Sequence, residues 1–215
     1  MFNSRRIATT GGDKFRDDFS VAFDGSNDYI DCGDVSDWDF SNGSASIFSV
    51  SAWFRSADGS PANNDTIVGK YNTGDNQREW RVSVDDSARI KVFTSDDGTA
   101  TDSAHTSFTV TDTNWHHVVF TYDGSVATAG LRTTLYVDGV NHGITITSGT
   151  FTAILHEGNK PLTIGSFTSG ESPAENWNGS ISEVAIYNSA LSASQVKTLY
   201  KGREPYNHKE GIASG

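Results

Sequence analysis

Hydrophobic and polar positions alternate along most of this chain in short stretches, a pattern typical of β-strands. Runs rich in β-branched and aromatic residues are separated by clusters of Gly, Asp, Asn and Ser, where a chain readily turns. One small sheet rarely contains so many strands, so the pattern predicts two antiparallel sheets packed face to face. The predicted strands are residues 20–23, 29–32, 46–55, 66–71, 79–84, 89–93, 105–110, 116–122, 133–137, 143–147, 161–165 and 180–187.

Two local signals refine this picture. The Asp-Gly pair at 138–139 lies between apolar flanks, which is the strongest short-range signal for a two-residue hairpin. One helix is predicted over residues 191–202, because Ser192 is a good N-cap and Gln195 completes a capping box three residues later. We therefore expect an all-β sandwich with one short C-terminal helix.

Alternation within the strands separates a core face from a second face. In residues 46–55, for example, Val50 and Phe54 would face the core while Trp53 and Arg55 would face away. The same reading of the other strands puts aromatic and hydrogen-bonding side chains on one surface, as a sugar ligand requires. The alternative is that these side chains only fill a curved sheet face. This second surface would carry Ser51, Trp53, Arg55, Glu79, Arg81, Ser83, Lys91, Phe93, His117 and Tyr136.

Two polar loops offer a competing binding site, because binding residues are often carried by loops. One loop spans residues 71–80 and the other, rich in Gly, Ser and Pro, spans residues 169–179. Trp177 in the second loop would either contact a ligand or anchor the loop against the sandwich. From both surfaces, the candidate ligand-binding residues are Trp53, Arg55, Tyr71, Arg78, Arg81, Trp177 and Asn178.

The amino-acid composition limits the kinds of ligand and partner that the protein can bind. The chain of 215 residues has 16 basic and 27 acidic side chains, a formal charge of −11, which argues against nucleic acid as a ligand. No apolar run is long enough to insert into a membrane, and Cys32 has no second cysteine with which to form a disulfide. We expect a flexible lead-in over residues 1–18 without a secretion signal, one domain over 19–202 and a loose tail over 203–215.

Within the stretch FDGSNDYIDCG, residues 23–33, the turn at residues 24–28 combines turn-forming residues with two carboxylates and an amide. Turn chemistry alone explains Asp24, Gly25 and Asn27, but the same oxygens would suit a hard cation such as calcium. Glu183 stands out separately, because it lies between apolar neighbours where an unpaired carboxylate is unfavourable. A basic side chain or a cation would satisfy it.

The order of several motifs resembles the laminin-G-like, pentraxin-related domains of the concanavalin A-like superfamily. The matching segments are FDGSNDYIDCG, FSVSAWFR, TIVGKY, WHHVVFTYDG, LYVDGV, PLTIGS and GSISEVAIYNSALSASQV, which cover roughly residues 19–200.

This resemblance implies a jelly roll of two curved sheets, often with a structural calcium ion, that binds glycans or protein surfaces. In this family the calcium often bridges the first and last strands. Carried over, its ligands would be Asp24, the backbone around Gly25 and Asn27, and Glu183, with Asp28 as a further candidate.

The resemblance leaves catalysis to be weighed separately, because this fold also carries hydrolases and lyases. The E-x-D-x-x-E strand motif of such hydrolases is absent, and no carboxylate pair can be nominated for glycoside hydrolysis. We therefore expect a non-catalytic, calcium-stabilised module that recognises glycans or another cell-surface ligand.

The alternative is a structural or decoration domain of a virion or phage tail, and a polysaccharide hydrolase or lyase is the least favoured reading. Self-association or virion assembly is left open, and the expected location is extracellular or on a particle surface, as part of an assembly.

Overall fold

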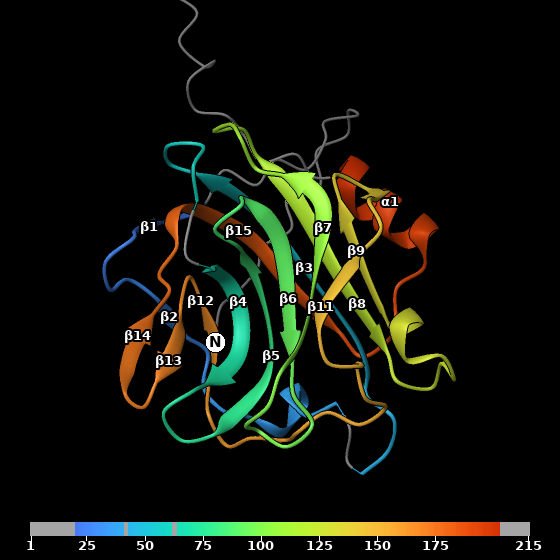
Figure 1. Cartoon of the computed structure of the whole chain (residues 1–215). Coiled ribbons are helices and arrows are strands. Elements are labelled where there is room, and N and C mark those ends of the chain that lie inside the picture. The colour runs from blue at the N-terminus through green and yellow to red at the C-terminus, as the bar shows by residue number, and fades with distance from the viewer. Residues whose placement is uncertain (1–19, 41–42, 62–63, 203–215) are drawn as a thin grey trace, which may run out of the picture.

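The computed structural model describes residues 20–40, 43–61 and 64–202 and shows two sheets packed as a sandwich (Figure 1). The six-stranded sheet runs in the order β1 (Val21–Asp24), β15 (Asn178–Tyr187), β3 (Ile47–Ser56), β8 (His116–Asp123), β9 (Thr133–Val137), β10 (Val140–Asn141). The path of the nine-stranded sheet is β11 (Thr145–Ser148), β7 (Asp102–Thr109), β6 (Arg89–Thr94), β5 (Gln77–Val84), β4 (Asp65–Asn72), β12 (Leu162–Ile164), β2 (Ile30–Asp31). A hairpin of β13 (Phe167–Ser169) and β14 (Ser172–Ala174) joins the second sheet beside β4.

The prediction of a two-sheet jelly roll with one short C-terminal helix is confirmed. Each of the predicted strands has a counterpart, with ends shifted by a few residues, while β10, β13 and β14 were not predicted. Two short 3₁₀ turns, η1 (Ser36–Trp38) and η2 (Ala129–Leu131), complete the elements. The predicted lead-in over 1–18 and tail over 203–215 lie outside the described residues.

The core lies between the sheets and is built by the predicted alternation. Val50, Ala52 and Phe54 on β3 are buried in it, and so are Trp80, Val82, Val84, Ile90 and Val92 on the facing sheet. At its centre, the Phe48 ring contacts Phe40, Trp80, Phe120 and Tyr122, with ring centroids 4.5 to 5.8 Å away. Such aromatic packing supplies much of the apolar area that a domain of this size buries.

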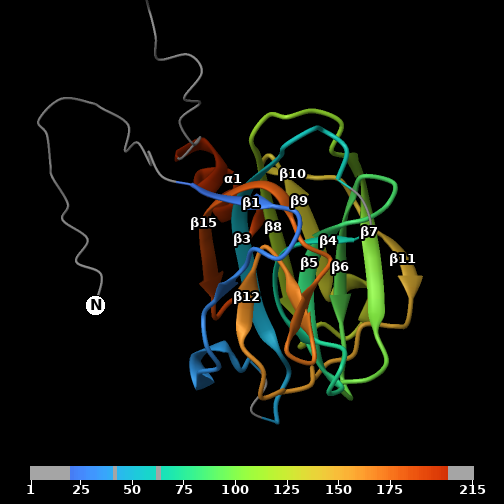
Figure 2. The ribbon, with the colours of Figure 1, turned by 90° about the vertical axis from the view of Figure 1, so that its left-hand side faces the viewer.

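The helix α1 (Ala193–Gly202) packs on the outer face of the six-stranded sheet, seen edge-on in Figure 2. The predicted capping box is present, since the Ser192 N–H donates to Gln195 Oε1 at 2.9 Å and the Gln195 N–H donates to Ser192 Oγ at 3.4 Å. Leu191 and Val196 are buried with Val119 and Tyr136 of the sheet. The helix therefore covers this sheet face and removes part of it from solvent.

One fully buried cation, Lys70 on β4, joins several segments at one end of the sandwich. Its Nζ lies 2.6 Å from Glu79, 2.8 Å from Asp39 and 3.2 Å from Asp34, and donates to the Gly158 carbonyl at 2.8 Å. Burial alone would lower the pKa of Lys70, but the carboxylates of Glu79 and Asp39 outweigh it and raise the pKa. Lys70 therefore stays charged, and its partners hold it in place.

Replacing Lys70 with methionine should lower the free energy of unfolding by about 3–5 kcal/mol, because Glu79 would remain buried without its cation. Urea unfolding followed by tryptophan fluorescence measures this loss. Lys160→Met is the matched control, since Lys160 pairs with the exposed carboxylates of Asp75 and Glu171 and should change stability by no more than about 1 kcal/mol. Equal stabilities of the two variants would contradict the role assigned to Lys70.

Candidate functional site

The predicted second surface is divided between two sheets that face opposite ways, so the expectation of one shared surface is wrong. Trp53 and Arg55 lie on β3 of the six-stranded sheet, whereas Arg81 and Phe93 lie on β5 and β6 of the nine-stranded sheet. Alternation assigned Trp53, Arg55, Arg81 and Phe93 correctly to the side away from the core, but it carries no information on which sheet a strand joins. It was wrong for Glu79, because a bulge where β5 pairs with β4 breaks the alternation and Glu79 is buried against Lys70. The two outer faces are therefore separate candidates.

On the six-stranded sheet, Trp53 is packed under α1 and is only 2% exposed. Its ring lies 5.7 Å from the Tyr200 ring of the helix and 5.0 Å from the His117 ring of β8. The prediction that Trp53 contacts a ligand is corrected accordingly, because the helix occupies the space above it.

Two neighbouring histidines on β8 have opposite surroundings. Burial lowers the pKa of His117 to about 4, and its Nδ1 is buried without a hydrogen bond. Burial would also lower the pKa of His116, but the hydrogen bonds and charges of Asp138 at 2.8 Å and Asp112 at 3.1 Å raise it overall. His117 is therefore a neutral packing residue, and His116 is an ion-pair partner that joins two loops.

On the nine-stranded sheet, Arg81 is enclosed by aromatic rings. Its guanidinium carbon lies 4.1 Å from the centroid of Phe93, 4.5 Å from that of Phe167 and 4.8 Å from that of Tyr71. Glu175 closes this cage through an ion pair with Arg81. The residue opposite Arg81 on β4 is Gly69, and any side chain at that position would collide with Arg81. Arg81 and Tyr71 are 4% and 5% exposed, so both predicted ligand residues serve mainly to build the floor of this face.

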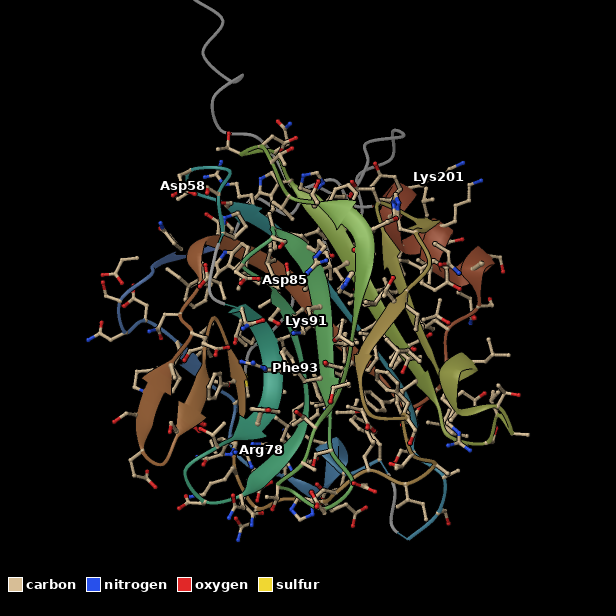
Figure 3. The ribbon with its side chains drawn as sticks, viewed as in Figure 1. Asp58, Arg78, Asp85, Lys91, Phe93 and Lys201 are labelled. Atoms are coloured by element: carbon tan, nitrogen blue, oxygen red, sulfur yellow. The ribbon has the colours of Figure 1, made fainter. Side chains whose placement is uncertain are left out.

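Beside this cage lies a partly open surface, which we call the β6–β7 surface and define as Lys91, Phe93, Ser103 and His105. Strand register places Lys91 opposite His105 and Phe93 opposite Ser103. Lys91, Phe93 and His105 are half-buried, and Figure 3 shows Lys91 and Phe93 on the outer side of the sheet. Ser103 is buried and its hydroxyl bonds Thr147 at 2.7 Å. The aromatic ring, the cation and the imidazole of the other three residues can stack on a sugar and hydrogen-bond its hydroxyl groups.

The loop residues have mixed outcomes. Trp177 is fully buried, and its ring meets the Phe54 ring edge-on at a centroid distance of 5.6 Å. It therefore anchors its loop, and the prediction that it contacts a ligand is wrong. Arg78 at the rim of the nine-stranded sheet donates to Asn76 Oδ1 at 3.3 Å and to the Gly98 carbonyl at 3.1 Å. Asn178 is exposed, but it lies beside Gly25 in the turn at residues 24–28, which we call the first turn, away from the β6–β7 surface.

The turn at residues 24–28 closes on itself through its carboxylates. Asp24 Oδ1 accepts the Ser26 N–H at 2.8 Å, and Asp28 Oδ2 accepts the Asp24 N–H at 3.1 Å. Asn176 reaches the turn from the other side of the sandwich edge, since its Nδ2 donates to the Ser26 carbonyl at 2.7 Å. The Asn176 Oδ1 is buried there without a hydrogen-bond partner.

Glu183 does not join this turn, which corrects the predicted bridge between Asp24 and Glu183. Asp24 pairs with Asn178 in the sheet, so Glu183 is five positions further along β15, at a distance of about 16 Å. A shift of register between Ser182 and Ala185 accompanies a positive φ of 48° at Glu183, and its side chain lines an open apolar groove of about 570 Å³ between the sheet edges. Sequence alone gives no signal of this bulge.

Among the described residues, no three His, Cys, Asp or Glu side chains are grouped so that they could hold a metal ion by themselves. An oxygen site at the first turn would therefore have to include amide or carbonyl oxygens, as calcium sites commonly do. Within the same part of the chain, no helix is long and apolar enough to span a membrane.

The chain belongs to the concanavalin A-like lectin/glucanases superfamily, since the Laminin_G_3 family model matches residues 24–197. No curated protein sequence matches the chain.

Solved structures with the same fold include carbohydrate-binding and lectin-like domains. A heptameric SAP-like pentraxin from Limulus polyphemus has a TM-score of 0.60 at 14% identity, over 84% of this chain and 81% of its own. Domain 4 of AbnA, an extracellular arabinanase from Geobacillus stearothermophilus solved with arabinotriose, has a TM-score of 0.58 at 18% identity, over 88% of this chain and 82% of its own.

The CBM40 of a Ruminococcus gnavus sialidase, solved with α2,3 sialyllactose, has a TM-score of 0.58 at 12% identity, over 81% of this chain and 96% of its own. At such low identities these likenesses establish the fold and leave the ligand of this chain open.

The stability of the protein should fall as the pH drops from 6.5 to about 4, partly through His117. The unfolded chain protonates His117 near pH 6.5 whereas the folded protein does so only near 4, so the unfolded state binds the extra proton within this window. The loss from this one group is at most about 3 kcal/mol. Urea unfolding of wild type and His117→Gln across this range measures it, because the difference between the two isolates His117.

His116 acts in the opposite sense, since its raised pKa adds stability that is complete below pH 6.5 and is lost as the pH rises through its folded pKa. It is therefore protonated in both states through most of the window and does not mimic His117. A stability difference between wild type and His117→Gln that stays constant from pH 6.5 to 4 would contradict the assignment of a neutral buried ring.

Proposed function

We propose that this domain is a non-catalytic glycan-binding module whose ligand lies on the β6–β7 surface. Its superfamily supports this proposal, as do the structural relatives solved with arabinotriose and with sialyllactose. The observation that carries it is the fixed aromatic floor, in which Arg81 holds the rings of Tyr71, Phe93 and Phe167 in one cluster. A ring that is already fixed loses little conformational freedom when a sugar stacks on it.

The charges around this floor also favour binding over catalysis. Glu175 is committed to Arg81, and Asp85 at the far end of β5 is committed to Arg89 at 2.8 Å. Glycoside hydrolysis requires two carboxyl groups that face each other across the scissile bond, one of them free to exchange a proton. Lys91, by contrast, has no carboxylate partner within 4.0 Å among the described residues and can donate to sugar oxygens.

Replacing Phe93 with alanine should weaken glycan binding about three- to tenfold, because the sugar would lose its stacking surface. The measurement is a glycan array that identifies a ligand for the wild type, followed by calorimetric titration of that ligand. Tyr29→Ala is the matched control, since Tyr29 is an aromatic residue 38% exposed near β2, away from the β6–β7 surface. Undiminished binding by Phe93→Ala with a known ligand would overturn the proposed location.

A blank array on folded protein would overturn the glycan function and favour the second candidate, a structural domain of a virion or other particle. One observation supports that role. The edge strands β10 and β11 each carry an exposed apolar side chain, Val140 and Ile146, at 54% and 41% exposure. Sheet edges with exposed apolar residues are suited to pairing between chains. Either role would be exercised outside the cell or on a particle surface.

We further propose that calcium stabilises the first turn. Its ligands would be oxygens of Asp24 and Asp28 together with Asn176 Oδ1, in place of the Glu183 expected from the family. The support is the unpartnered, buried Asn176 Oδ1, whose amide bonds the Ser26 carbonyl of the turn that also carries two carboxylates, so that the available donors are all oxygens. Calcium bound there would tie the β1 turn to the segment before β15 and hold two chain regions that are distant in sequence.

Removing calcium with EDTA should lower the melting temperature by roughly 5–10 °C relative to a calcium concentration a hundredfold above Kd, and added calcium should restore it. Differential scanning calorimetry of wild type, Asp28→Asn and Glu183→Gln separates the two possible ligand sets. Asp28→Asn should lose most of the calcium response, while Glu183→Gln should keep it. A response lost in Glu183→Gln alone, or no response in the wild type, would refute the proposed site.

A further inference from the structure

A polar pocket of about 350 Å³ opens on the outer face of the six-stranded sheet, where β1, β15 and β3 lie side by side (Figure 2). It lies at the end of the sheet beyond Trp53, and the loop before β8 forms its other wall. We call it the Arg55 pocket. Its lining includes Arg55, Ser56, Thr113, Asn114, Gly179 and Ser180.

Arg55 in this pocket has no counter-charge among the residues that the structure describes. Its Nε donates weakly to Ser180 Oγ at 3.4 Å, and its guanidinium carbon lies 5.4 Å from the centroid of the Trp115 ring. In the described part of the chain, no carboxylate lies within 4.0 Å of Arg55, whereas Arg81 and Arg89 each have one. The terminal nitrogens of Arg55 make no hydrogen bond to any described residue, so they remain available as donors.

The nearest loops do contain acidic residues, but these are engaged elsewhere. Asp112 accepts the Asn114 N–H at 2.8 Å and contacts His116, and Asp58 accepts the Ser60 N–H at 2.9 Å and the Ser56 hydroxyl at 3.0 Å. A half-buried guanidinium that stacks on an indole and faces a polar cavity is well suited to a carboxylate from outside, which it can bind through two parallel hydrogen bonds.

We infer that the Arg55 pocket binds a carboxylate-bearing sugar unit, such as a uronic acid. Arg55 pairs with the carboxylate, and the exposed Thr113 in the lining offers a hydroxyl to the sugar. The volume lies near the lower end of the range for small-molecule pockets, about 300–1,000 Å³, so it suits one sugar unit better than a chain of them.

This site is independent of the β6–β7 surface, because the two lie on opposite outer faces of the sandwich. A chain with a net charge of −11 does not attract anions over long distances, so the selection of an acidic sugar rests on the local contacts of Arg55. Binding should therefore be measured at about 0.15 M salt, where the Debye length is about 8 Å.

The test compares methyl β-D-glucuronide with methyl β-D-glucoside, which differ in the carboxylate, by NMR titration of the ¹⁵N-labelled protein. The indole N–H signal of Trp115 is the local reporter. We expect the glucuronide to shift this signal and to bind about five- to tenfold more tightly than the glucoside. Equal affinities of the two glycosides, or a glucuronide that shifts signals of the β6–β7 surface in place of Trp115, would overturn the inference.

Variants locate the charge that is responsible. Arg55→Gln should abolish the preference for the glucuronide, and Arg55→Lys should retain part of it, because the charge stays while the two parallel bonds are lost. Lys197→Gln, at an exposed position of α1 outside both proposed sites, is the control for loss of a cation and should bind both glycosides as the wild type does. A preference that survives in Arg55→Gln would overturn the inference. If Arg55→Gln does not fold, Arg55→Lys and the comparison of the two glycosides on wild-type protein still decide the matter.

Phe93→Ala separates this inference from the proposed function. It should leave the binding of the glucuronide unchanged, since Phe93 and Arg55 lie on different sheets. Loss of glucuronide binding in Phe93→Ala would show that the acidic sugar binds at the β6–β7 surface and would overturn the assignment to Arg55.

Discussion

The packing of two apolar sheet faces against each other is the constraint on which this structure depends. Each strand must turn every second side chain inward, and Phe48, Trp80 and Phe120 fill the space between the sheets. Apart from the buried Lys70 and its partners at one end, the polar groups considered as binding sites therefore lie on the two outer faces and the loops. Since the outer faces point in opposite directions, no single ligand can contact both, and the Arg81 cage and the Arg55 pocket are necessarily independent.

The sequence was sufficient to predict the strands and the helix because their signals are local, whereas the jelly roll was implied by the family resemblance. Alternation in residues 46–55 and 79–84 predicted the inward positions of Val50, Phe54 and Trp80, and the capping box at Ser192 predicted the start of the helix. The allocation of strands to sheets depends on long-range pairing, which alternation does not encode. For this reason Trp53 and Arg81 were expected on one surface although they lie on two.

The candidate sites were predictable to a smaller extent, because they depend on register and on what covers a residue. Nothing in the sequence around Trp177 distinguishes a loop residue that binds from one that is fully buried against Phe54. The pairing of Asp24 with Asn178 moves Glu183 away from the first turn and brings Asn176 to it. Trp115 and Asn114 were missed as well, since their relation to Arg55 arises only when the loop before β8 meets β3.

The buried Lys70 has a consequence for how the molecule opens. It joins β4 and β5 to the segment around Asp39 and to the long connection that contains Gly158, which are far apart in sequence. If any one of these segments separates from the rest, it leaves an unpaired charge in a desolvated position. Local opening at this end of the sandwich is therefore cooperative, and the backbone amides of these segments exchange with solvent as one unit. The protein has no disulfide, and Lys70 gives these segments one shared free energy of opening in place of a separate one for each loop.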